Sequence, residues 1–283
     1  MNKFASGPKR HYYGKGDVIA YRLNRARGSG GAPVFGANVL LLLYGDTFWK
    51  TYTEGDNTRL IATDSMKNFI QRETMNFPGN DLEAYCRFLG ETFLKKYAQV
   101  EGLQISASEI PYAAFGSDVA FAPSGPDTAT ARLEIDRSGI VEAASGVRGF
   151  RLLRLGGSAF KGFVRDEYTT LPDLHNRPLH MWLDLEWNYV TPDAAFSDGA
   201  VTARARDIVR DVFASFESGS IQQVIYQMGM KMLGEVPAMF EVHLEANNRT
   251  WDTIAEQGDA LGVYTDARPP YGCLGLTLKR TDL

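Results

Sequence analysis

Cysteine and histidine are scarce in this sequence. Its 283 residues include two cysteines, Cys86 and Cys273, and four histidines. A disulfide scaffold needs several cysteine pairs, and a zinc site needs ligands at short spacings such as Cys-x-x-Cys or His-x-x-x-His, which do not occur. We therefore expect a reduced, intracellular protein with no metal site.

Long apolar runs and an excess of positive charge are also missing. No run of 18 apolar residues occurs, and residues 1–13 are polar and basic, without the apolar core of a signal peptide. The 30 basic and 34 acidic residues give a net charge of −4, which argues against nucleic acid as the main partner. The expectation is a cytoplasmic protein that binds neither membranes nor nucleic acid.

Apolar residues are plentiful enough for a substantial core. They make up 44% of the chain, and aromatic residues make up 12%. A chain of this length can bury one large core or two ordinary ones, and we favour two domains.

The pattern of elements repeats along the chain. The first half predicts strands at 17–23 and 38–52 joined through a glycine turn at 28–31, helices beginning at Ser65 and Asp81, and strands at 103–110 and 129–135. The second half predicts strands at 150–155 and 180–189, helices at 202–217 and 221–236, and strands at 240–246 and 274–279. Both halves thus run strand, strand, helix, helix, strand, strand.

Sequence similarity between two segments supports two copies of one unit. Residues 89–105, which begin Leu-Gly, align without gaps on residues 228–244, which begin Met-Gly. We therefore predict an α+β fold with one unit at 1–144 and a second at 145–283. A single irregular α+β domain is the alternative.

One segment combines a phenyl ring with a guanidinium group. Phe160 opens it and Arg177 closes it, with Phe-Val-Arg-Asp-Glu-Tyr-Thr-Thr-Leu between them at 163–171. An aromatic face can stack on a flat ring, and a guanidinium can donate two parallel charge-assisted hydrogen bonds. The pair suits a flat, negatively charged heterocycle. The segment resembles the substrate-binding stretch of urate oxidases, which implies that Phe160 stacks on urate and Arg177 holds its carboxamide edge.

The resemblance carries implications for the fold. The doubled unit resembles the tunnelling fold (T-fold), in which each half is an antiparallel four-stranded sheet with two helices on one face. Urate oxidases carry two such units per chain, and their sheets close into a barrel when subunits associate. The resemblance therefore implies a homotetramer with active sites between subunits. Unclosed sheet edges also favour self-association on physical grounds.

Two motifs in the first half resemble further family stretches. Residues 13–18 (Tyr-Gly-Lys-Gly-Asp-Val) resemble the family's Tyr-Gly-Lys-x-x-Val, which implies that Lys15 belongs to a proton relay. Residues 56–57 (Asp-Asn) and 62–68 (Ala-Thr-Asp-Ser-Met-Lys-Asn) resemble the stretch whose threonine partners that lysine across the subunit interface. By this resemblance Thr63 is a relay residue and Asp64 backs the purine site. Thr, Asp and Ser before an apolar-periodic segment also favour a helix start, and both interpretations can hold.

Another match lies at the predicted helix start near residue 221. Ser220, Ile221 and Gln222 resemble the family's Ser-Val-Gln. The resemblance implies that the Ile221 backbone contacts the ring and that the Gln222 amide pairs with the edge opposite Arg177. Without the rest of the pattern, a glutamine here would be an exposed capping residue.

The chain departs from the family at residues 247–251. The family usually has Pro-Asn-Lys-His-Tyr, and this chain has Asn-Asn-Arg-Thr-Trp. Asn248 keeps the asparagine that faces the oxygen or water site, but Thr250 replaces the relay histidine, and a hydroxyl cannot titrate near neutral pH. Either the relay runs through Lys15, Thr63 and water, which we favour, or activity is reduced. His243, which alternates with apolar strand residues, is expected to be a satisfied structural histidine.

The chemistry implied by the resemblance is the oxidation of urate by O2 and water to 5-hydroxyisourate, with release of H2O2. No cofactor is expected, because the sequence has no motif for a redox centre, and urate would supply the electrons itself. One rival is a purine or pterin hydrolase of the same fold, which would need a zinc site. Another is a non-catalytic purine-binding protein, suggested by Thr250.

Overall fold

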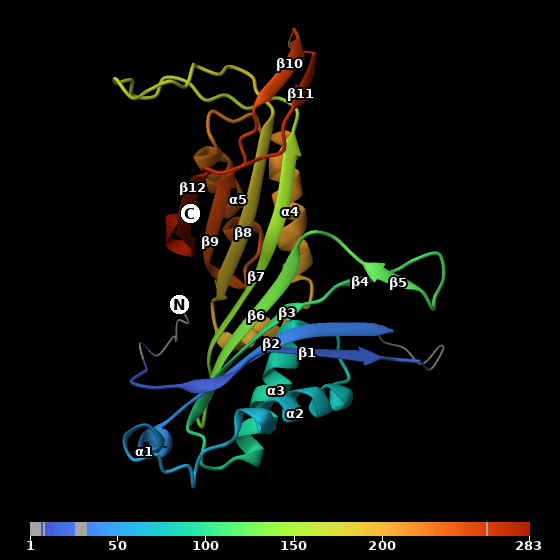
Figure 1. Ribbon diagram of the computed structural model, residues 1–283, viewed down its shortest axis with the longest axis vertical. Coiled ribbons are helices and arrows are strands. Elements are labelled where there is room, and N and C mark those ends of the chain that lie inside the picture. Colours follow the sequence, from blue (N-terminus) through green and yellow to red (C-terminus); the bar gives the residue numbers. More distant parts are fainter. Residues whose placement is uncertain (1–6, 8, 26–32, 259) are drawn as a thin grey trace. The chain divides into compact units, whose positions relative to one another are not determined.

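The protein is described by a computed structural model that covers residues 7, 9–25, 33–258 and 260–283 (Figure 1). The glycine turn expected at 28–31 lies outside these residues. The chain folds into two compact units. The first comprises Met1–Gly146 and Asn188–Ala200, and the second comprises Val147–Trp187 and Val201–Leu283.

The first unit is a sheet with two long helices packed on it (Figure 1). Its strands in spatial order are β1 (Tyr13–Leu23), β2 (Val34–Tyr44), β3 (Gly102–Glu109) and β6 (Thr128–Asp136), and each neighbouring pair among them is antiparallel. Its long helices are α2 (Thr63–Glu73), which contacts β1, and α3 (Leu82–Lys96), which contacts β3 and β6. Alternate residues of β6, from Ala129 to Ile135, are buried, which is the period expected of a strand with one covered face.

Two parts of the first unit differ from the sequence prediction. The strand expected at 38–52 ends at Tyr44, and the chain continues as a 3-10 helix, Asp46–Phe48, and the short helix α1 (Trp49–Thr53). Gly45 has φ 143°, a conformation that glycine adopts readily and that redirects the chain there. The hairpin of β4 (Tyr112–Ala114) and β5 (Phe121–Pro123) was not predicted, because these strands are short and largely exposed and carry little periodic signal.

The second unit repeats this arrangement. Its strand order is β7 (Gly139–Arg154), β8 (Leu179–Tyr189), β9 (Met239–Asn248) and β12 (Gly272–Lys279), and β7 begins in the first unit. The helices α4 (Val201–Ser215) and α5 (Ile221–Glu235) lie side by side, with α5 on β9 and β12 (Figure 1). A separate hairpin pairs β10 (Thr253–Gln257) with β11 (Leu261–Tyr264). None of the helices in the described residues is long and apolar enough to cross a membrane.

The two similar segments place a glycine, Gly90 or Gly229, at an equivalent packing position in each unit. A Cβ on Gly90 of α3 would lie 2.5 Å from the Ile135 side chain on β6, and one on Gly229 of α5 would lie 2.7 Å from Leu278 on β12. Both distances are too short for a real contact, so each helix approaches its sheet at a glycine. The aligned glycines therefore serve the same close helix-to-sheet contact.

Strand β8 shows which face of the second sheet is covered. Along its length buried and half-buried residues alternate strictly, and Met181, Leu183 and Leu185 are on the buried side. Trp182 and Asp184 are on the other side and are half-buried. Strand β8 thus has one apolar side and one polar side, as expected when helices cover only one face of its sheet.

A buried carboxyl group joins the stretch 188–200 to the rest of the first unit. Glu83, in the first turn of α3, is 6% exposed. The Tyr189 hydroxyl donates to Ser145 Oγ at 2.9 Å and approaches Glu83 Oε1 at 3.4 Å, and the Ser145 hydroxyl donates to Glu83. Burial raises the pKa of Glu83 to about 7. Three segments that are distant in sequence therefore share one buried polar network.

Candidate functional site

Backbone hydrogen bonds hold the segment that carries Phe160 and Arg177 against the start of α5. The Arg177 amide donates to the Ser158 carbonyl at 2.9 Å, and the Ala159 amide donates to the Ser218 carbonyl at 2.7 Å. Ser218 lies just before α5. The segment predicted to hold the ring and the helix predicted to hold its opposite edge are thus neighbours in the second unit.

The guanidinium of Arg177 lies near the Phe160 ring. Its Cζ atom is 5.7 Å from the ring centroid, and Phe160 itself stacks on Phe163 with centroids 5.0 Å apart. Arg177 Nε is buried and makes no hydrogen bond to any residue that the structure describes. Burial lowers the pKa of Arg177 from its usual value. A buried donor without a partner is costly, and an acceptor brought by a ligand would satisfy it.

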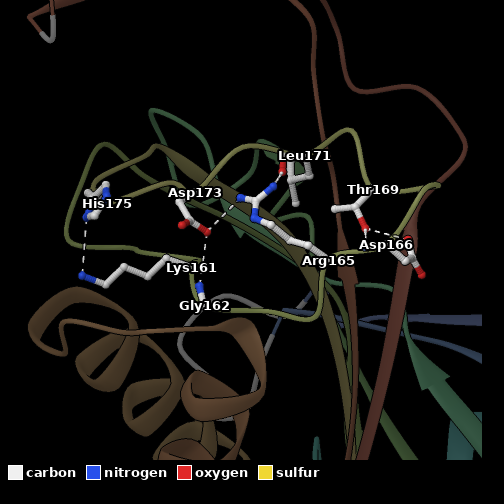
Figure 2. A network of polar contacts seen from close by, with 8 residues as sticks. All are labelled: Lys161, Gly162, Arg165, Asp166, Thr169, Leu171, Asp173 and His175. Carbon is white, nitrogen blue, oxygen red and sulfur yellow. Dashed lines mark hydrogen bonds and ion pairs between the residues drawn. The ribbon is translucent and has the colours of Figure 1, made fainter.

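Several polar and charged residues in the loop between Phe160 and Arg177 contact one another (Figure 2). Arg165 pairs with Asp173 at 3.2 Å, and the Gly162 amide donates to the same Asp173 oxygen at 3.2 Å. The Gly162 bond and then Arg165 lower the pKa of Asp173. Lys161 Nζ lies 3.4 Å from His175 Nδ1. These contacts shape the loop, and none of them involves Arg177.

Two neighbouring glutamines in the first turn of α5 differ in their hydrogen bonds. Ser220 is the N-cap and accepts a hydrogen bond from the Gln223 amide at 3.2 Å, while Gln223 Oε1 accepts one from the Gly219 amide at 2.8 Å. The capping glutamine is therefore Gln223. Gln222 is exposed and unpaired within the described part of the chain, so its amide is available, and Ile221 is buried at the first helical position.

A β-bulge follows Lys15 on β1. The pairing of β1 with β2 shifts register between Lys15 and Val18, and Asp17 has φ 53°. The Asn38 side chain donates to Asp17 Oδ1 at 3.3 Å, across the two strands. Bulges often redirect a side chain beside an active site. The half-buried Lys15 is the side chain that this bulge adjoins.

Thr63 and Asp64 occupy the first turn of α2, close to Lys15. The helix begins at Thr63, two residues before the predicted start at Ser65, and its N-cap is Ala62, which provides no side-chain cap. Thr63 therefore does not cap the helix, and its hydroxyl makes no hydrogen bond with the residues described. Lys67 accounts for most of the lowering of the Asp64 pKa, and the Lys15 charge contributes as well. Lys15 thus lies within electrostatic range of this helix start.

The end of β9 carries the stretch that departs from the family. Asn248, its last residue, pairs with Gly272 of β12, and Thr250 is exposed. Between them, Arg249 donates its amide to the His180 carbonyl at 2.9 Å. This bond fixes the backbone on which Asn248 and Thr250 are carried.

The side chain of Arg249 is clamped between two aromatic rings. Its Cζ atom is 3.6 Å from the Trp182 ring centroid and 3.7 Å from that of Tyr271. Cation–π contacts of this kind stabilise a partly desolvated arginine. The clamp anchors the chain next to Asn248, and neither aromatic partner was identified from the sequence, because strand pairing was needed to bring them together.

Two histidines lie on the second sheet. His243 is satisfied as expected, since its ring nitrogens contact Thr277 Oγ1 at 2.8 Å and Glu245 Oε1 at 3.3 Å. The ring of His180 lies 5.4 Å from that of Trp251, next to the departing stretch. Burial, followed by the Arg249 charge, lowers the pKa of His180. Sequence spacing could not reveal this neighbour, because β8 and β9 are far apart along the chain.

A cavity of about 380 Å³ in the second unit is separate from Phe160 and Arg177. Its lining includes Trp182, Asp184, Glu245, Asn247, Arg249 and Cys273. Trp182 and Asp184 mark it as part of the polar sheet face.

The predicted site residues therefore form two groups. Phe160, Arg177, Ile221 and Gln222 converge around the start of α5 in the second unit, and Asn248 and Thr250 end β9 of that unit. Lys15, Thr63 and Asp64 form the other group in the first unit. No cluster of three or more His, Cys, Asp or Glu suited to a metal ion occurs among the residues searched, which are those the structure describes.

Comparisons with known proteins agree on one family. A family model named Uricase matches residues 143–274. The chain is 37% identical to the uric acid degradation bifunctional protein of Bacillus sp. strain TB-90, over 96% of this chain and 61% of that protein. It is 34% identical to the uricase of Halalkalicoccus jeotgali, over 96% of this chain and 98% of that protein. A solved uricase from Bacillus fastidious matches with a TM-score of 0.87 at 35% identity, covering 97% of this chain and 95% of that one.

These matches bear on the fold and on the alternatives. The chain shares with these structures an α+β fold built on a large antiparallel sheet. It spans 61% of the length of the bifunctional relatives. The names of the relatives give no support to a non-catalytic purine-binding protein.

Proposed function

The chain belongs to the uricase family, and we propose that it oxidises urate with O2 and water to 5-hydroxyisourate, releasing H2O2. The observation that carries this proposal is the half-buried Arg177 beside Phe160, whose buried Nε makes no hydrogen bond to the described residues, while the neighbouring Arg165 is paired with Asp173. An anionic, planar substrate would satisfy both side chains at once. The reaction would belong to purine degradation.

Substrate binding would use both ends of the group around α5. Arg177 would donate two parallel hydrogen bonds to one edge of urate, and the free amide of Gln222 would bind the opposite edge. The Ile221 backbone at the helix start would contact the ring, where the first amides of a helix favour negative charge. Phe160 would keep the ring flat. Fixed donors in a water-poor site stabilise an electron-rich anion more strongly than water does.

Proton transfer would fall to Lys15 and Thr63, with Asp64 behind the purine site. The Thr63 hydroxyl is unpaired in the described residues, and Lys15 is near enough to Asp64 to influence its pKa. Asn248 would face the oxygen or water above the ring. Because Thr250 cannot titrate near neutral pH, water would complete the relay in place of the family's histidine.

No cofactor is part of this proposal. In the family that the sequence resembles, urate itself gives up electrons to O2, and the protein binds the anion, orients it and moves protons. The residues named above are suited to these three tasks, because they are hydrogen-bond donors, a stacking ring and proton carriers.

We also propose the finer architecture that the family implies. Each half, 1–144 and 145–283, would be a T-fold unit, and four chains would close their sheets into barrels with active sites between subunits. Support comes from β1, which ends the strand order and exposes Ile19, Tyr21 and Leu23 by 47%, 48% and 61%. An apolar edge strand of this kind invites pairing with another chain. The proposed location is the cytoplasm.

Metal-free, flavin-free protein tests the activity directly. Urate absorbance and peroxide should be followed together, and the expected result is one peroxide released for each urate consumed. Urate loss that requires an added metal or flavin would contradict the proposed reaction, and so would tight urate binding without any peroxide.

A further inference from the structure

We propose that Tyr13 is a positioning residue that holds two relay groups of its own chain, Lys15 and Thr63, in register with each other. The resemblance pairs this lysine and threonine across the subunit interface, but in this structure Lys15 lies within electrostatic range of Asp64, next to Thr63, in the same chain. The inference rests on the proposed function, because it assigns Tyr13 a part in urate turnover. Tyr13 would touch neither urate nor oxygen, and it would act through the backbone on both sides of the relay.

The hydroxyl of Tyr13 connects β1 to the start of α2. It accepts a hydrogen bond from the Ile61 amide at 3.1 Å. Ile61 is 5% exposed, and it is followed directly by Ala62, the N-cap of α2, and then by Thr63. A bond at Ile61 therefore fixes the direction in which the chain enters the helix.

On the strand side, Tyr13 and Lys15 are close and rigidly related. They pair with Leu43 and Leu41 of β2, and residues two apart on a strand share a face. The residue between them is Gly14, where a Cβ would lie 1.8 Å from the Leu41 carbonyl oxygen. The strand is thus pressed against β2 at this point and can shift little. The bulge begins only after Lys15.

The ring of Tyr13 is held in place as well. It makes an edge contact with Phe48, with centroids 5.0 Å apart and planes at 76°, and Phe48 is fully buried. Burial raises the pKa of Tyr13 to about 12. The phenol therefore stays neutral across the pH range of enzyme assays, and its oxygen remains a constant partner for Ile61. One side chain then spans from the strand of Lys15 to the helix of Thr63.

The test removes the hydroxyl of Tyr13 and compares the effect on kcat with that of removing the hydroxyl of the nearby Tyr52. Tyr13→Phe keeps the ring and loses the acceptor, and Tyr52→Phe removes a hydroxyl that donates to the Tyr12 carbonyl at 2.9 Å instead. Because small misplacements of reacting groups are expensive, Tyr13→Phe should lower kcat by about tenfold or more while KM stays within about twofold. Tyr52→Phe should leave kcat within about twofold of the parent.

A double-mutant cycle separates positioning from general stability. In the Lys15→Met background the relay is already lost, so Tyr13→Phe should lower kcat by less than about twofold. A structural role alone would reduce kcat by the same factor in both backgrounds, and that result would overturn the inference. If Tyr13→Phe does not fold, Phe48→Leu loosens the ring and keeps the hydroxyl, and its kcat loss should likewise vanish with Lys15→Met.

Amide hydrogen exchange gives a readout that does not depend on urate. The Ile61 amide should exchange faster in Tyr13→Phe than in the parent and Tyr52→Phe, because it loses its acceptor. Unchanged exchange together with unchanged kcat would overturn the inference. If the parent releases no peroxide from urate, the proposed function fails, and with it the catalytic part of the inference, whereas the exchange result still decides whether Tyr13 holds the start of α2.

Discussion

Replacing Arg177 with alanine should weaken urate binding severely. Its Nε is buried and makes no hydrogen bond to the described residues, so this side of the guanidinium is shielded from water before any ligand arrives, and a bond from Nε to an anion would break no bond to those residues. A hydrogen bond to a charged group contributes about 1.5–3 kcal/mol, and two parallel bonds contribute about 3–6 kcal/mol. Since about 1.4 kcal/mol corresponds to tenfold in affinity, Kd should rise by at least about a hundredfold.

Binding can be measured without turnover when oxygen is removed. Anaerobic calorimetric titration with urate gives Kd for the parent, Arg177→Ala and Arg177→Lys. The lysine variant keeps the charge and loses the planar fork, so its Kd should lie between the other two. Thermal unfolding of Arg177→Ala should not fall below that of the parent, because the group removed makes no hydrogen bond through Nε to the described residues and its burial opposes its charge.

Arg165→Ala is the matched control. It removes an arginine of the same loop whose charge is paired with Asp173 and whose side chain is 49% exposed. Its Kd for urate should stay within about threefold of the parent, since exposed ion pairs contribute about 0–1 kcal/mol. If Arg177→Ala bound urate within twofold of the parent, the anchoring role of Arg177 would be refuted. An equal loss in the Arg165 variant would show that loop shape, not the guanidinium, governs binding.

Four more predictions concern turnover, binding and stability. Lys15→Met should lower kcat by about 10²–10⁴-fold with anaerobic urate affinity nearly unchanged, and parallel losses of both would contradict a relay role. Gln222→Ala should raise the Kd for urate, whereas Gln223→Ala should mainly lower the thermal midpoint, by the equivalent of about 0.5–1.5 kcal/mol for the lost side-chain hydrogen bond to the Gly219 amide; the reverse pattern would exchange their roles. Between pH 4.5 and about 7 the folded protein binds more protons at Glu83 than the unfolded chain does. The free energy of unfolding should therefore fall by about 3 kcal/mol as the pH rises through this range. In chemical denaturation at a series of pH values, Glu83→Gln should make this fall smaller. Arg249→Ala should lower the free energy of unfolding by about 1–4 kcal/mol through two lost cation–π contacts, and an unchanged denaturation curve would show that the clamp contributes nothing.

Much of the fold was predictable because helix and strand periods are local. The helices at 202–217 and 221–236 are confirmed to within a few residues as α4 and α5, and the aligned glycines 90 and 229 occupy equivalent positions. The errors occur where local signal is weak. Strand β7 begins at Gly139 instead of Phe150, because its first half is rich in small residues whose strand character comes from the neighbouring strands.

The candidate site was predictable only as a set of residues. Its motifs named Phe160, Arg177 and Gln222, but they could not show that the capping bond belongs to Gln223 or that the cap of α2 is Ala62. Such assignments depend on hydrogen-bond geometry. The stacking of Trp182 and Tyr271 on an arginine depends on strand pairing, which one sequence does not specify.

The return of residues 188–200 to the first unit has a consequence for dividing the chain. A fragment that stopped at residue 144 would enclose the Glu83 carboxyl without the hydroxyls of Ser145 and Tyr189 that now serve it. The earlier half thus depends on a stretch encoded in the middle of the later half. Cutting or permuting the chain at residue 144 would therefore leave a buried carboxyl without its hydroxyl partners.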